Sequence, residues 1–426
     1  MSVVFLQQTE VEAFTKKPEL ATFQAMVKGA SVNGDATHTI SIYISQLEQL
    51  AGLNQSSSGS DEDVVRLEGY CPLVNGRNAC YMNAVLQMLY SMSDFRQFFT
   101  NLDISKVTPS QFGSNGPTYV PFIKALATLF KTFQSKAGKV VDTDTLMMDG
   151  QSIYTILLSG SKEFKRGISA DAEELLRVSI FDPILEFKDA KDIYDLINIS
   201  TETTITCDNG RIRYDNSGVA EPSRSEIYNT FSLSLGNGNT IQNLIDSVST
   251  PEQMINTKVT DDNELLGCGN NPKEKGPATR IMELKAGIKL KYAILSLKRF
   301  KQNADGSITK IETAILPEKE ITIDGKKFQL KGCVCHSGSL SGGHYWYILC
   351  KNGDPIIELN DASVTPLTNP TAELKRLETL GYIYLYERVK VIGGSRSTRK
   401  QSRSRVRVPT RKSSRSSKKT SVSDKA

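Results

Sequence analysis

The chain has 426 residues, of which 39% are hydrophobic and 23% are charged. That length allows two or three ordinary domains, or one large domain with appendages, and the composition supports a sizeable core. No run approaches the roughly 18 consecutive apolar residues of a membrane helix, which argues against a membrane protein. The first residues do not resemble a secretory signal, so we expect an intracellular protein, cytoplasmic, nuclear or both.

The net charge of +5 is unevenly distributed along the chain. Residues 391–426 contain 12 Lys or Arg and one Asp, so this segment carries +11 and the remainder about −6. Because large apolar residues are almost absent from it, packing cannot offset its ordering entropy, and we predict a disordered basic tail rich in Ser, Arg and Lys. Such a charge is typical of segments that bind nucleic acid or another acidic partner, and equally of solvated localisation tails.

The polar, acidic stretch NQSSSGSDED begins at residue 54 and predicts a flexible linker over residues 54–68. It separates the main body from an N-terminal segment, residues 1–53, to which we assign no role. The alternation in THTISIYISQL, residues 37–47, favours one strand there. The seven cysteines of the chain are odd in number and scattered, which favours reduced thiols over a disulfide framework.

The main body changes from helical to extended patterns along the chain. An amphipathic helix is predicted over residues 80–99, approached by a loop at 75–79, and further helices at 119–135 and 171–187. Segments rich in β-branched and aromatic residues then predict strands at 201–207, 230–235, 288–300, 326–335, 345–350 and 381–389. Helices followed by strands indicate an α+β fold.

Cys80 would begin the predicted helix at 80–99, where free N–H groups and the helix dipole favour a thiolate. A cysteine on a helix is more often a small buried hydrophobe, so the position alone is a weak signal. A thiol nucleophile needs a base, and the chain has only three histidines. His344 precedes an apolar strand, which is a rigid mount for a base, although a lone histidine there is more often structural. Asn360 and Asp361 end another predicted strand, where either could accept the imidazole proton.

Six segments resemble, in the same order, the motifs of the ubiquitin-specific proteases, which are deubiquitinating cysteine peptidases with a papain-like triad. They are NACYMNAVLQ, DAEELL, LSLKRF, LKGCVCHSGSLSGGHYWY, LNDASVTPL and GYIYLYER, and the resemblance spans residues 69–390. It implies a papain-like α+β catalytic domain with a helical thumb bearing the cysteine, a β palm bearing the histidine, and β fingers that hold ubiquitin.

The resemblance also implies catalytic roles for individual residues. Cys80 would be the nucleophile, His344 the general base and then acid, and Asn360 the residue that orients the imidazole, with Asp361 in reserve. Asn75 would donate a hydrogen bond to the oxyanion. The function implied is hydrolysis of the peptide or isopeptide bond after the C-terminal glycine of ubiquitin, without a cofactor.

Other positions correspond to substrate contacts in that family. Asp171 and Glu174 would hold the arginine-containing tail of ubiquitin, for which a carboxylate provides charge-assisted hydrogen bonds. An ordinary solvated helix face explains the same two residues. Gly342 and Gly343 would line the narrow channel for ubiquitin's diglycine end, next to Tyr345. Ubiquitin and ubiquitinated proteins are therefore the expected partners.

The fingers of this family usually hold zinc through two CxxC pairs, but each corresponding stretch here keeps one cysteine, Cys207 and Cys268. Two thiolates do not complete a tetrahedral site, so we predict no structural zinc. A second cluster offers an alternative metal set that would include the base; its members are Cys333, Cys335, His336 and His344. The resemblance explains these residues without a metal, with His336 in a structural role.

Arg77 and Ala79 stand where the family commonly has glycine and threonine, and Ser169 and Ala170 replace its usual glutamine pair. Arg77 would lower the thiol pKa if it lies near the sulfur, or crowd the entrance if it does not. These departures leave the triad unchanged, which favours an active enzyme. The alternative is a weak or inactive ubiquitin-binding scaffold, tethered to nucleic acid or another acidic partner by the basic tail.

Overall fold

The computed structural model describes residues 70–207, 223–236, 238–254, 277–339 and 342–389. All of them belong to one compact unit. The predicted N-terminal segment, linker and basic tail lie outside the described residues, so they stay predictions. Among the helices that are described, none has the length and apolarity to cross a membrane.

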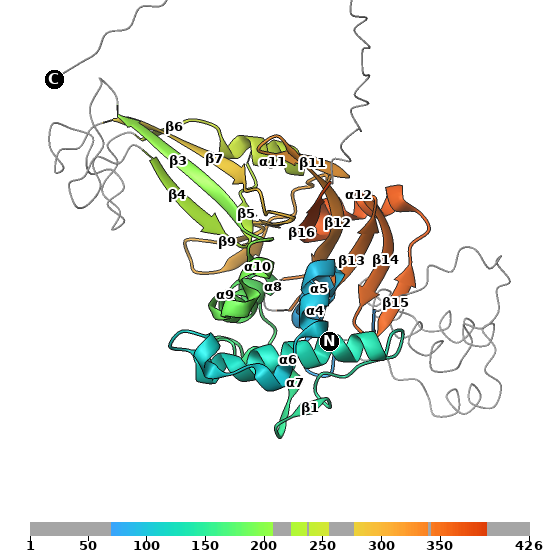
Figure 1. The fold of residues 1–426 in the computed structure, drawn as a ribbon. Coiled ribbons are helices and arrows are strands. Elements are labelled where there is room, and N and C mark those ends of the chain that lie inside the picture. The colour runs from blue at the N-terminus through green and yellow to red at the C-terminus, as the bar shows by residue number, and fades with distance from the viewer. Residues whose placement is uncertain (1–69, 208–222, 237, 255–276, 340–341, 390–426) are drawn as a thin grey trace, which may run out of the picture. The chain divides into compact units, whose positions relative to one another are not determined.

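The first half of the described chain is helical, as the sequence predicts. Its helices are α4 (Cys80–Ser91), α5 (Ser93–Asn101), α6 (Gly116–Ser135), α7 (Ile153–Leu158), α8 (Ala172–Glu174), the π-helical η3 (Leu175–Phe181), α9 (Asp182–Glu186) and α10 (Lys191–Tyr194), with single 3₁₀ turns η1 (Ile104–Lys106), η2 (Pro109–Gln111) and η4 (Lys188–Ala190), and a small hairpin of β1 (Met147–Met148) and β2 (Gln151–Ser152). The helices lie together in the lower part of the view, with α6 and α7 below the strands and α4 and α5 beside the palm (Figure 1).

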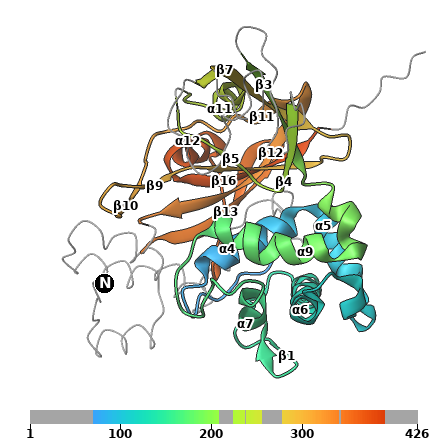
Figure 2. The same ribbon diagram turned by 90° about the vertical axis from the view of Figure 1, so that its left-hand side faces the viewer.

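The prediction of one amphipathic helix over residues 80–99 is wrong in two respects. The helix is divided at Met92, whose extended backbone (φ −77°, ψ 102°) ends α4 and starts α5. All 12 residues of α4 are buried, because it packs on strands β12 (Lys326–Ser337), β13 (His344–Lys351) and β14 (Asp354–Asn360) on one side and lies above α6 and α7 on the other (Figures 1 and 2). A helix covered on all sides needs no polar face, so its apolar residues do not mark a single stripe.

The second half forms the predicted strands, and all of them except the one at 201–207 belong to an eight-stranded palm sheet with the order β15-β14-β13-β12-β16-β8-β5 and with β11 also paired to β12. All of its pairs are antiparallel except β5 with β8. The strands are β5 (Phe231–Leu233), β8 (Tyr292–Leu297), β11 (Glu320–Ile323), β12 (Lys326–Ser337), β13 (His344–Lys351), β14 (Asp354–Asn360), β15 (Ser363–Pro366) and β16 (Gly381–Arg388). A separate hairpin pairs β9 (Phe300–Gln302) with β10 (Ile308–Lys310).

Both faces of the palm sheet are buried, and alternate residues of β13 show this. Tyr345 and Tyr347 belong to the core formed with the helices, whereas Trp346 and Ile348 belong to a second core on the opposite face. The second core is covered by α11 (Ile241–Val248) and α12 (Pro370–Leu380), which contact strands of the sheet. Burial on two faces explains why β13 is apolar throughout instead of alternating.

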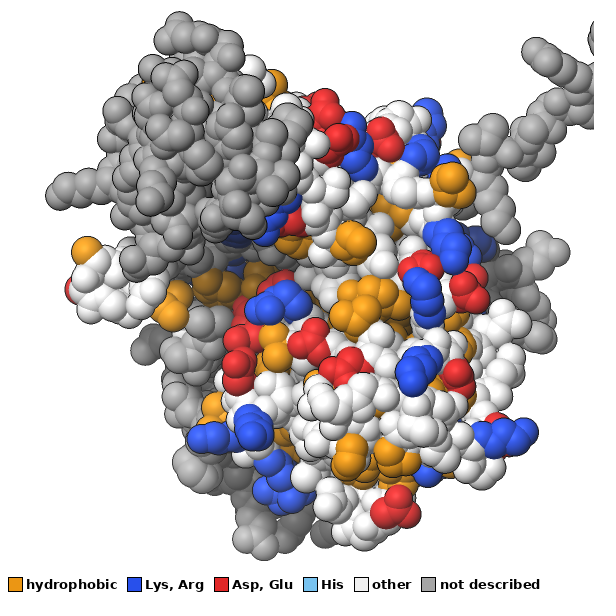
Figure 3. Space-filling model, turned by 60° about the vertical axis from the view of Figure 1, so that its left-hand side comes forward, with side chains coloured by type: hydrophobic (Ala, Val, Ile, Leu, Met, Phe, Trp, Pro, Cys, Tyr) orange, Lys and Arg blue, Asp and Glu red, His pale blue; other side chains and the backbone are white. Residues whose placement is uncertain are grey.

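A four-stranded finger sheet projects from the palm, on the upper left of the view (Figure 1). Its order is β4-β3-β7-β6, all antiparallel, with β3 (Ile199–Cys207), β4 (Ser223–Tyr228), β6 (Glu252–Met254) and β7 (Ala278–Ala286). On the face shown in Figure 3, charged side chains of both signs are interspersed and hydrophobic ones form only small groups.

The cysteines are not all reduced, contrary to the prediction. Five described cysteines are free, but Cys207, at the end of β3, is disulfide-bonded, and its partner lies outside the described residues. A disulfide requires that the fold bring two side chains within bonding distance, and the scatter of cysteines along a sequence does not predict that.

Candidate active site

Cys80 is the first residue of α4, and the loop before it is held by a side chain. The Asn75 Oδ1 atom accepts a hydrogen bond of 2.7 Å from the backbone N–H of Ala79, the residue that caps the helix. Asn78 adopts a left-handed backbone (φ 54°), which asparagine tolerates better than most residues. Cys80 itself is buried, with 4% of its surface exposed.

His344 is the first residue of β13, on the palm sheet. Its Nε2 atom lies 2.7 Å from the Oδ1 atom of Asn360, the last residue of the neighbouring strand β14. Because Asn360 Oδ1 can only accept a hydrogen bond, this contact places a proton on Nε2. Nδ1 is then the ring nitrogen that Asn360 does not engage. Asp361 Oδ2 lies farther from the same nitrogen, at 3.8 Å. The geometry therefore favours Asn360 over Asp361 as the direct partner of the ring.

Asp361 joins the two sides of the site. Its Oδ2 atom accepts a 2.9 Å hydrogen bond from Asn75 Nδ2, and its Oδ1 atom accepts a 2.8 Å bond from Asn83 Nδ2 on α4. Its backbone carbonyl also accepts from the N–H of Leu73 at 2.8 Å. Burial raises the pKa of Asp361, while these amide donors and His344 lower it. Asp361 thus connects the end of β14, beside the imidazole, to the loop and helix that carry the thiol.

The pKa of His344 reflects its position between these groups. Burial acts to lower it, but hydrogen bonding with Cys80 and Asn360 and the negative charge of Asp361 outweigh burial and raise it to about 9. The ring also stacks on Trp346, with centroids 5.9 Å apart. A raised histidine pKa beside a cysteine favours the imidazolium at neutral pH, which is the partner a thiolate requires.

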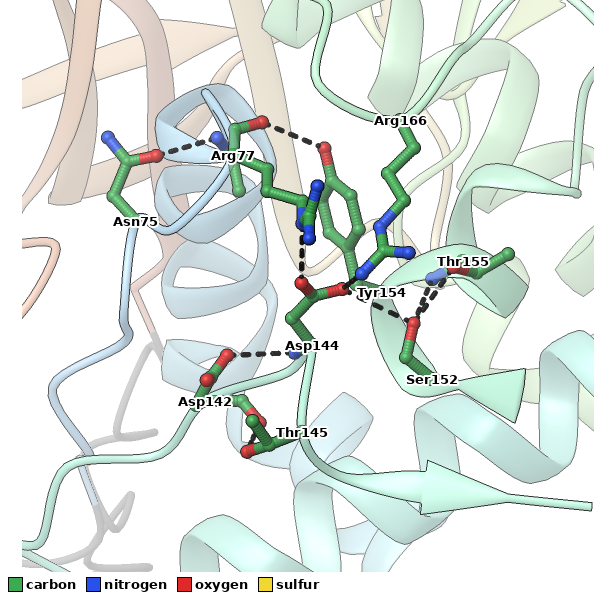
Figure 4. A network of polar contacts seen from close by, with 10 residues as sticks. Asn75, Arg77, Asp142, Asp144, Thr145, Ser152, Tyr154, Thr155 and Arg166 are labelled. Atoms are coloured by element: carbon green, nitrogen blue, oxygen red, sulfur yellow. Dashed lines mark hydrogen bonds and ion pairs between the residues drawn. The ribbon is translucent and has the colours of Figure 1, made fainter. Parts of the chain in front are cut away.

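Arg77 forms an ion pair with an acidic residue of the helical part, and its effect on the thiol or on the entrance stays a prediction. Its Nε atom forms an ion pair of 2.8 Å with Asp144, and Arg166 pairs with the same carboxylate (Figure 4). The Tyr154 hydroxyl donates to the backbone carbonyl of Arg77 at 3.2 Å. The Arg77 guanidinium is thus paired with Asp144 of the thumb. This ion pair holds the exposed part of the loop before Cys80.

Asp171 is engaged by the protein itself. Its Oδ1 atom accepts from the backbone N–H groups of Glu173 and Glu174, which caps α8. Its Oδ2 atom accepts from the hydroxyl of Tyr382 at 2.7 Å and lies 3.5 Å from that of Tyr345. Only 1% of the Tyr345 surface is exposed, so its hydroxyl contacts Asp171 from within the core. Glu174 is only partly buried, and burial together with Glu163 raises its pKa.

Gly343 lies directly on His336. A Cβ atom added to Gly343 would be 2.0 Å from His336 Nε2, whereas one added to Gly342 would make only an ordinary contact with the Ser339 side chain. His336 is fully buried and packs against Tyr345 with centroids 4.4 Å apart. Gly343 therefore has to be glycine for internal packing, whatever its relation to a substrate channel.

The alternative metal set does not assemble. Cys333 and Cys335 belong to the core beneath α12, whereas His336 packs against Tyr345, which faces the helices. Within the part of the chain that the structure describes, no group of three or more potential ligand residues could hold a metal ion. Alternation along β12 explains the separation, because successive side chains point to opposite faces.

Three residues of the site were missed by sequence reasoning. Asn83 is a polar residue with 2% exposure inside an otherwise apolar helix, and that pattern was available as a signal. Asp144 binds Arg77 and Glu358 accepts from Asn360, across 67 and two residues respectively. Neither pairing has a sequence signal, because each depends on how the folded chain places two side chains.

Comparison with solved structures finds the same fold in the yeast SAGA deubiquitinating module, which contains Ubp8, Sgf11, Sus1 and Sgf73. A form of this module bound to monoubiquitin matches with a TM-score of 0.55 at 16% identity, covering 84% of this chain and 76% of the other. A form bound to ubiquitin aldehyde matches with a TM-score of 0.54 at 18% identity, covering 84% and 77%. A sequence search of curated proteins found no match.

The fold and the family match together define a cysteine-type deubiquitinase with thumb, palm and fingers. The family model described as ubiquitin carboxyl-terminal hydrolase matches residues 71–386, which is well over half of the chain. The chain therefore belongs to the ubiquitin carboxyl-terminal hydrolase family, and its fold is of the ubiquitin-specific protease type.

Proposed function

We propose that this protein hydrolyses the peptide or isopeptide bond after the C-terminal glycine of ubiquitin, with Cys80, His344 and Asn360 as its catalytic residues. One observation carries the proposal: His344 Nε2 lies 2.7 Å from Asn360 Oδ1, and Cys80 is among the groups that raise the pKa of the same ring. Nucleophile, base and orienting amide thus come from three separate elements, α4, β13 and β14.

In the proposed reaction, the Cys80 thiolate attacks the carbonyl carbon of the terminal glycine, and the carbonyl oxygen takes the negative charge. The His344 imidazolium then gives a proton to the leaving amine, which departs as the C–N bond breaks and leaves a thioester on Cys80. The neutral imidazole next takes a proton from water, whose oxygen attacks the thioester and releases ubiquitin. Asn360 Oδ1 accepts from Nε2–H throughout and keeps the ring oriented.

Asn75 is the proposed side-chain donor to the oxyanion. One N–H of its amide donates to Asp361 and the other is available, since an amide nitrogen carries two hydrogens. Its carbonyl holds the N–H of Ala79, so the amide is fixed at both ends. Removal of one donor of this kind costs about 2.7 to 4 kcal/mol in the transition state.

Ubiquitin is the proposed substrate because solved relatives with this fold are bound to it. Glu174 would pair with the arginine-containing tail, and Gly342 would leave room for the diglycine end. A cavity of about 660 Å³, bounded by the helical part, the palm and the fingers, offers a further hollow surface for ubiquitin; Glu173, Arg177, Tyr228 and Arg280 are among its lining residues. An intracellular setting and a nucleic-acid or acidic partner for the basic tail stay predictions.

A ubiquitin probe that ends in an electrophile tests the proposal. The full chain should be labelled covalently, and Cys80→Ala should abolish labelling while still binding ubiquitin. Cys71→Ala is the matched control, because Cys71 is also buried but donates to the carbonyls of Phe133 and Lys136, on the far side of the loop. Measurable ubiquitin binding by the wild type without labelling would support the scaffold instead. Loss of that binding after deletion of residues 391–426 would assign it to the tail.

A further inference from the structure

A carboxylate lies behind the orienting amide. Glu358 and Asn360 alternate on β14 and so share one face of the strand. The Asn360 Nδ2 atom donates to Glu358 Oε1 at 3.3 Å, while Asn360 Oδ1 faces the imidazole at 2.7 Å. Only 16% of the Glu358 side chain is exposed, so this acceptor is largely shielded from water.

The direction of the Asn360 amide decides what the imidazole faces. An amide has an acceptor at one end and donors at the other, and the two ends have nearly the same shape. If the amide turned over, Nδ2 would oppose His344 Nε2–H and Oδ1 would oppose the Glu358 carboxylate, which places donor against donor and acceptor against acceptor. The carboxylate therefore favours the one orientation in which Oδ1 accepts from the ring.

Glu358 is itself fixed by helix α12. Arg376 of that helix pairs with Glu358 Oε2, and its Nε atom lies 2.9 Å from Glu373. The guanidinium carbon also lies 6.0 Å from the ring centroid of Trp346, the residue on which His344 stacks. One cation of α12 thus reaches both the amide, through Glu358, and the imidazole, through Trp346.

We propose that Glu358, held by Arg376, is a positioning residue that sets the orientation of the Asn360 amide and thereby the proton and direction of the His344 ring. This inference rests on the proposed function, in which His344 is the base. Helix α12 lies on the face of the palm away from the thiol. The inference gives this helix a part in the reaction, although neither Glu358 nor Arg376 touches the substrate.

A double-mutant cycle tests the inference on the full chain, with ubiquitin bearing a fluorogenic amine as the substrate. Glu358→Ala should lower kcat/KM by roughly 10- to 100-fold, mainly through kcat, as expected when an orienting partner is lost. Asn360→Asp removes the amide, and a carboxylate has two equivalent oxygens. In that background Glu358→Ala should cause little loss or a gain, since it also removes a like charge. An equal loss in both backgrounds would overturn the proposal.

The role of Arg376 is tested in parallel. Arg376→Met should reproduce the kcat loss of Glu358→Ala, and Arg376→Lys should recover part of it because the ammonium group still pairs with the carboxylate. Lys375→Met is the matched control on the same helix, since the Lys375 side chain is 78% exposed and pairs only with Glu378 among the ion pairs of the described residues. A lower melting temperature for Arg376→Met without a change in kcat would mean that the pair is structural only.

A measurement without ubiquitin separates this inference from the proposed function. The chain has three histidines, so the imidazole ¹⁵N spectrum is simple, and His344→Gln identifies the signal of His344. Glu358→Ala should lower the His344 pKa, because the amide oxygen that stabilises the imidazolium is no longer held in place. An unchanged His344 pKa refutes the positioning role. A lowered pKa in a protein that the ubiquitin probe fails to label refutes the proposed function and leaves the positioning role standing.

Discussion

The two sides of the active site are constructed differently. On the thiol side, Cys80 starts a fully buried helix, but residues 75–78 before it are exposed and held by side-chain contacts from Asn75, Arg77 and Asn78. On the imidazole side, His344 starts a strand with paired neighbours on both edges and cores on both faces.

This difference separates activity from stability. Contacts of an exposed loop contribute little to the free energy of unfolding, yet they determine where the helix N-terminus and the oxyanion donor lie. Substitutions within the palm sheet disturb packed neighbours and affect both properties. We therefore expect changes on the thiol side to act mainly on rate, and changes at the joint or on the palm side to act on rate and stability together.

The largest effect is expected at Asp361, the joint between the two sides. Asp361→Asn retains a residue that tolerates the observed left-handed backbone (φ 50°). Its new amide group must face the amide donor of Asn75 or Asn83, so we expect a loss of about 1 to 3 kcal/mol in unfolding free energy. Displacement of the loop and loss of the charge near His344 should lower kcat/KM by about 100-fold.

Steady-state kinetics and urea denaturation measure both effects of Asp361→Asn. Asp354→Asn is the control, because Asp354 starts the same strand and forms an ion pair with Lys319. Near-wild-type values of kcat/KM for Asp361→Asn would show that the two sides do not depend on this carboxylate.

Gly343→Ala tests the palm side next to the base. The added Cβ would meet His336 Nε2 at 2.0 Å, and His336 is buried, so the backbone beside His344 has to move. A displacement near 1 Å at a catalytic group costs about 100-fold in rate, and we expect a loss approaching that in kcat. Gly342→Ala should be far milder, since its Cβ would make only an ordinary contact. Equal losses in both variants would instead indicate a steric block of the substrate path.

Much of the fold could be predicted from the sequence because its periodic patterns are local. The strand at 345–350 and the helix at 119–135 match β13 and α6 closely. The break at Met92 and the burial of α4 on every side could not be predicted, because both follow from what surrounds the helix rather than from its own residues.

The site was predictable to the extent that single residue types carry its chemistry. His344 Nε2 lies 2.7 Å from Asn360 Oδ1, and Cys80 is among the groups that raise the His344 pKa, while the catalytic roles of the three residues stay predictions. The partners that set their orientation were not predictable, since Glu358 with Arg376 and Asp144 with Arg77 are ordinary charged residues until the fold pairs them. Asp171 was expected to contact the substrate. In the structure its carboxylate caps α8 and accepts a hydrogen bond from Tyr382, and the sequence does not indicate either contact.

The two described histidines should give opposite pH dependences of stability. Burial and the nearby charge of Lys310 lower the pKa of His336 to about 4, whereas that of His344 is raised to about 9, each from the ordinary histidine pKa of 6.5. The contribution of His344 is fully present below pH 6.5 and is lost as the pH rises through about 9. That of His336 is present above pH 6.5 and is lost as the pH falls towards about 4.

Urea denaturation of the wild type, His344→Gln and His336→Gln between pH 4 and about pH 9 resolves the two contributions by difference. The difference in unfolding free energy between the wild type and His344→Gln should narrow towards high pH. The corresponding difference for His336→Gln should narrow towards low pH. A difference for His344→Gln that is independent of pH would mean that its ring is not paired with the thiol side.

The smallest effect is expected for Arg77→Gly, which introduces the residue common in the family. The Arg77 side chain is 54% exposed, and Asp144 keeps Arg166 as a partner after the substitution. An exposed ion pair is worth at most about 1 kcal/mol, so the unfolding free energy should change by less than that. The Tyr154 hydroxyl still reaches the backbone carbonyl of residue 77, so kcat/KM should fall only a few-fold, and less at high salt, where the pair is screened. A large loss of kcat/KM at unchanged stability would show that the exposed pair, and not Asn75, sets the position of the thiol.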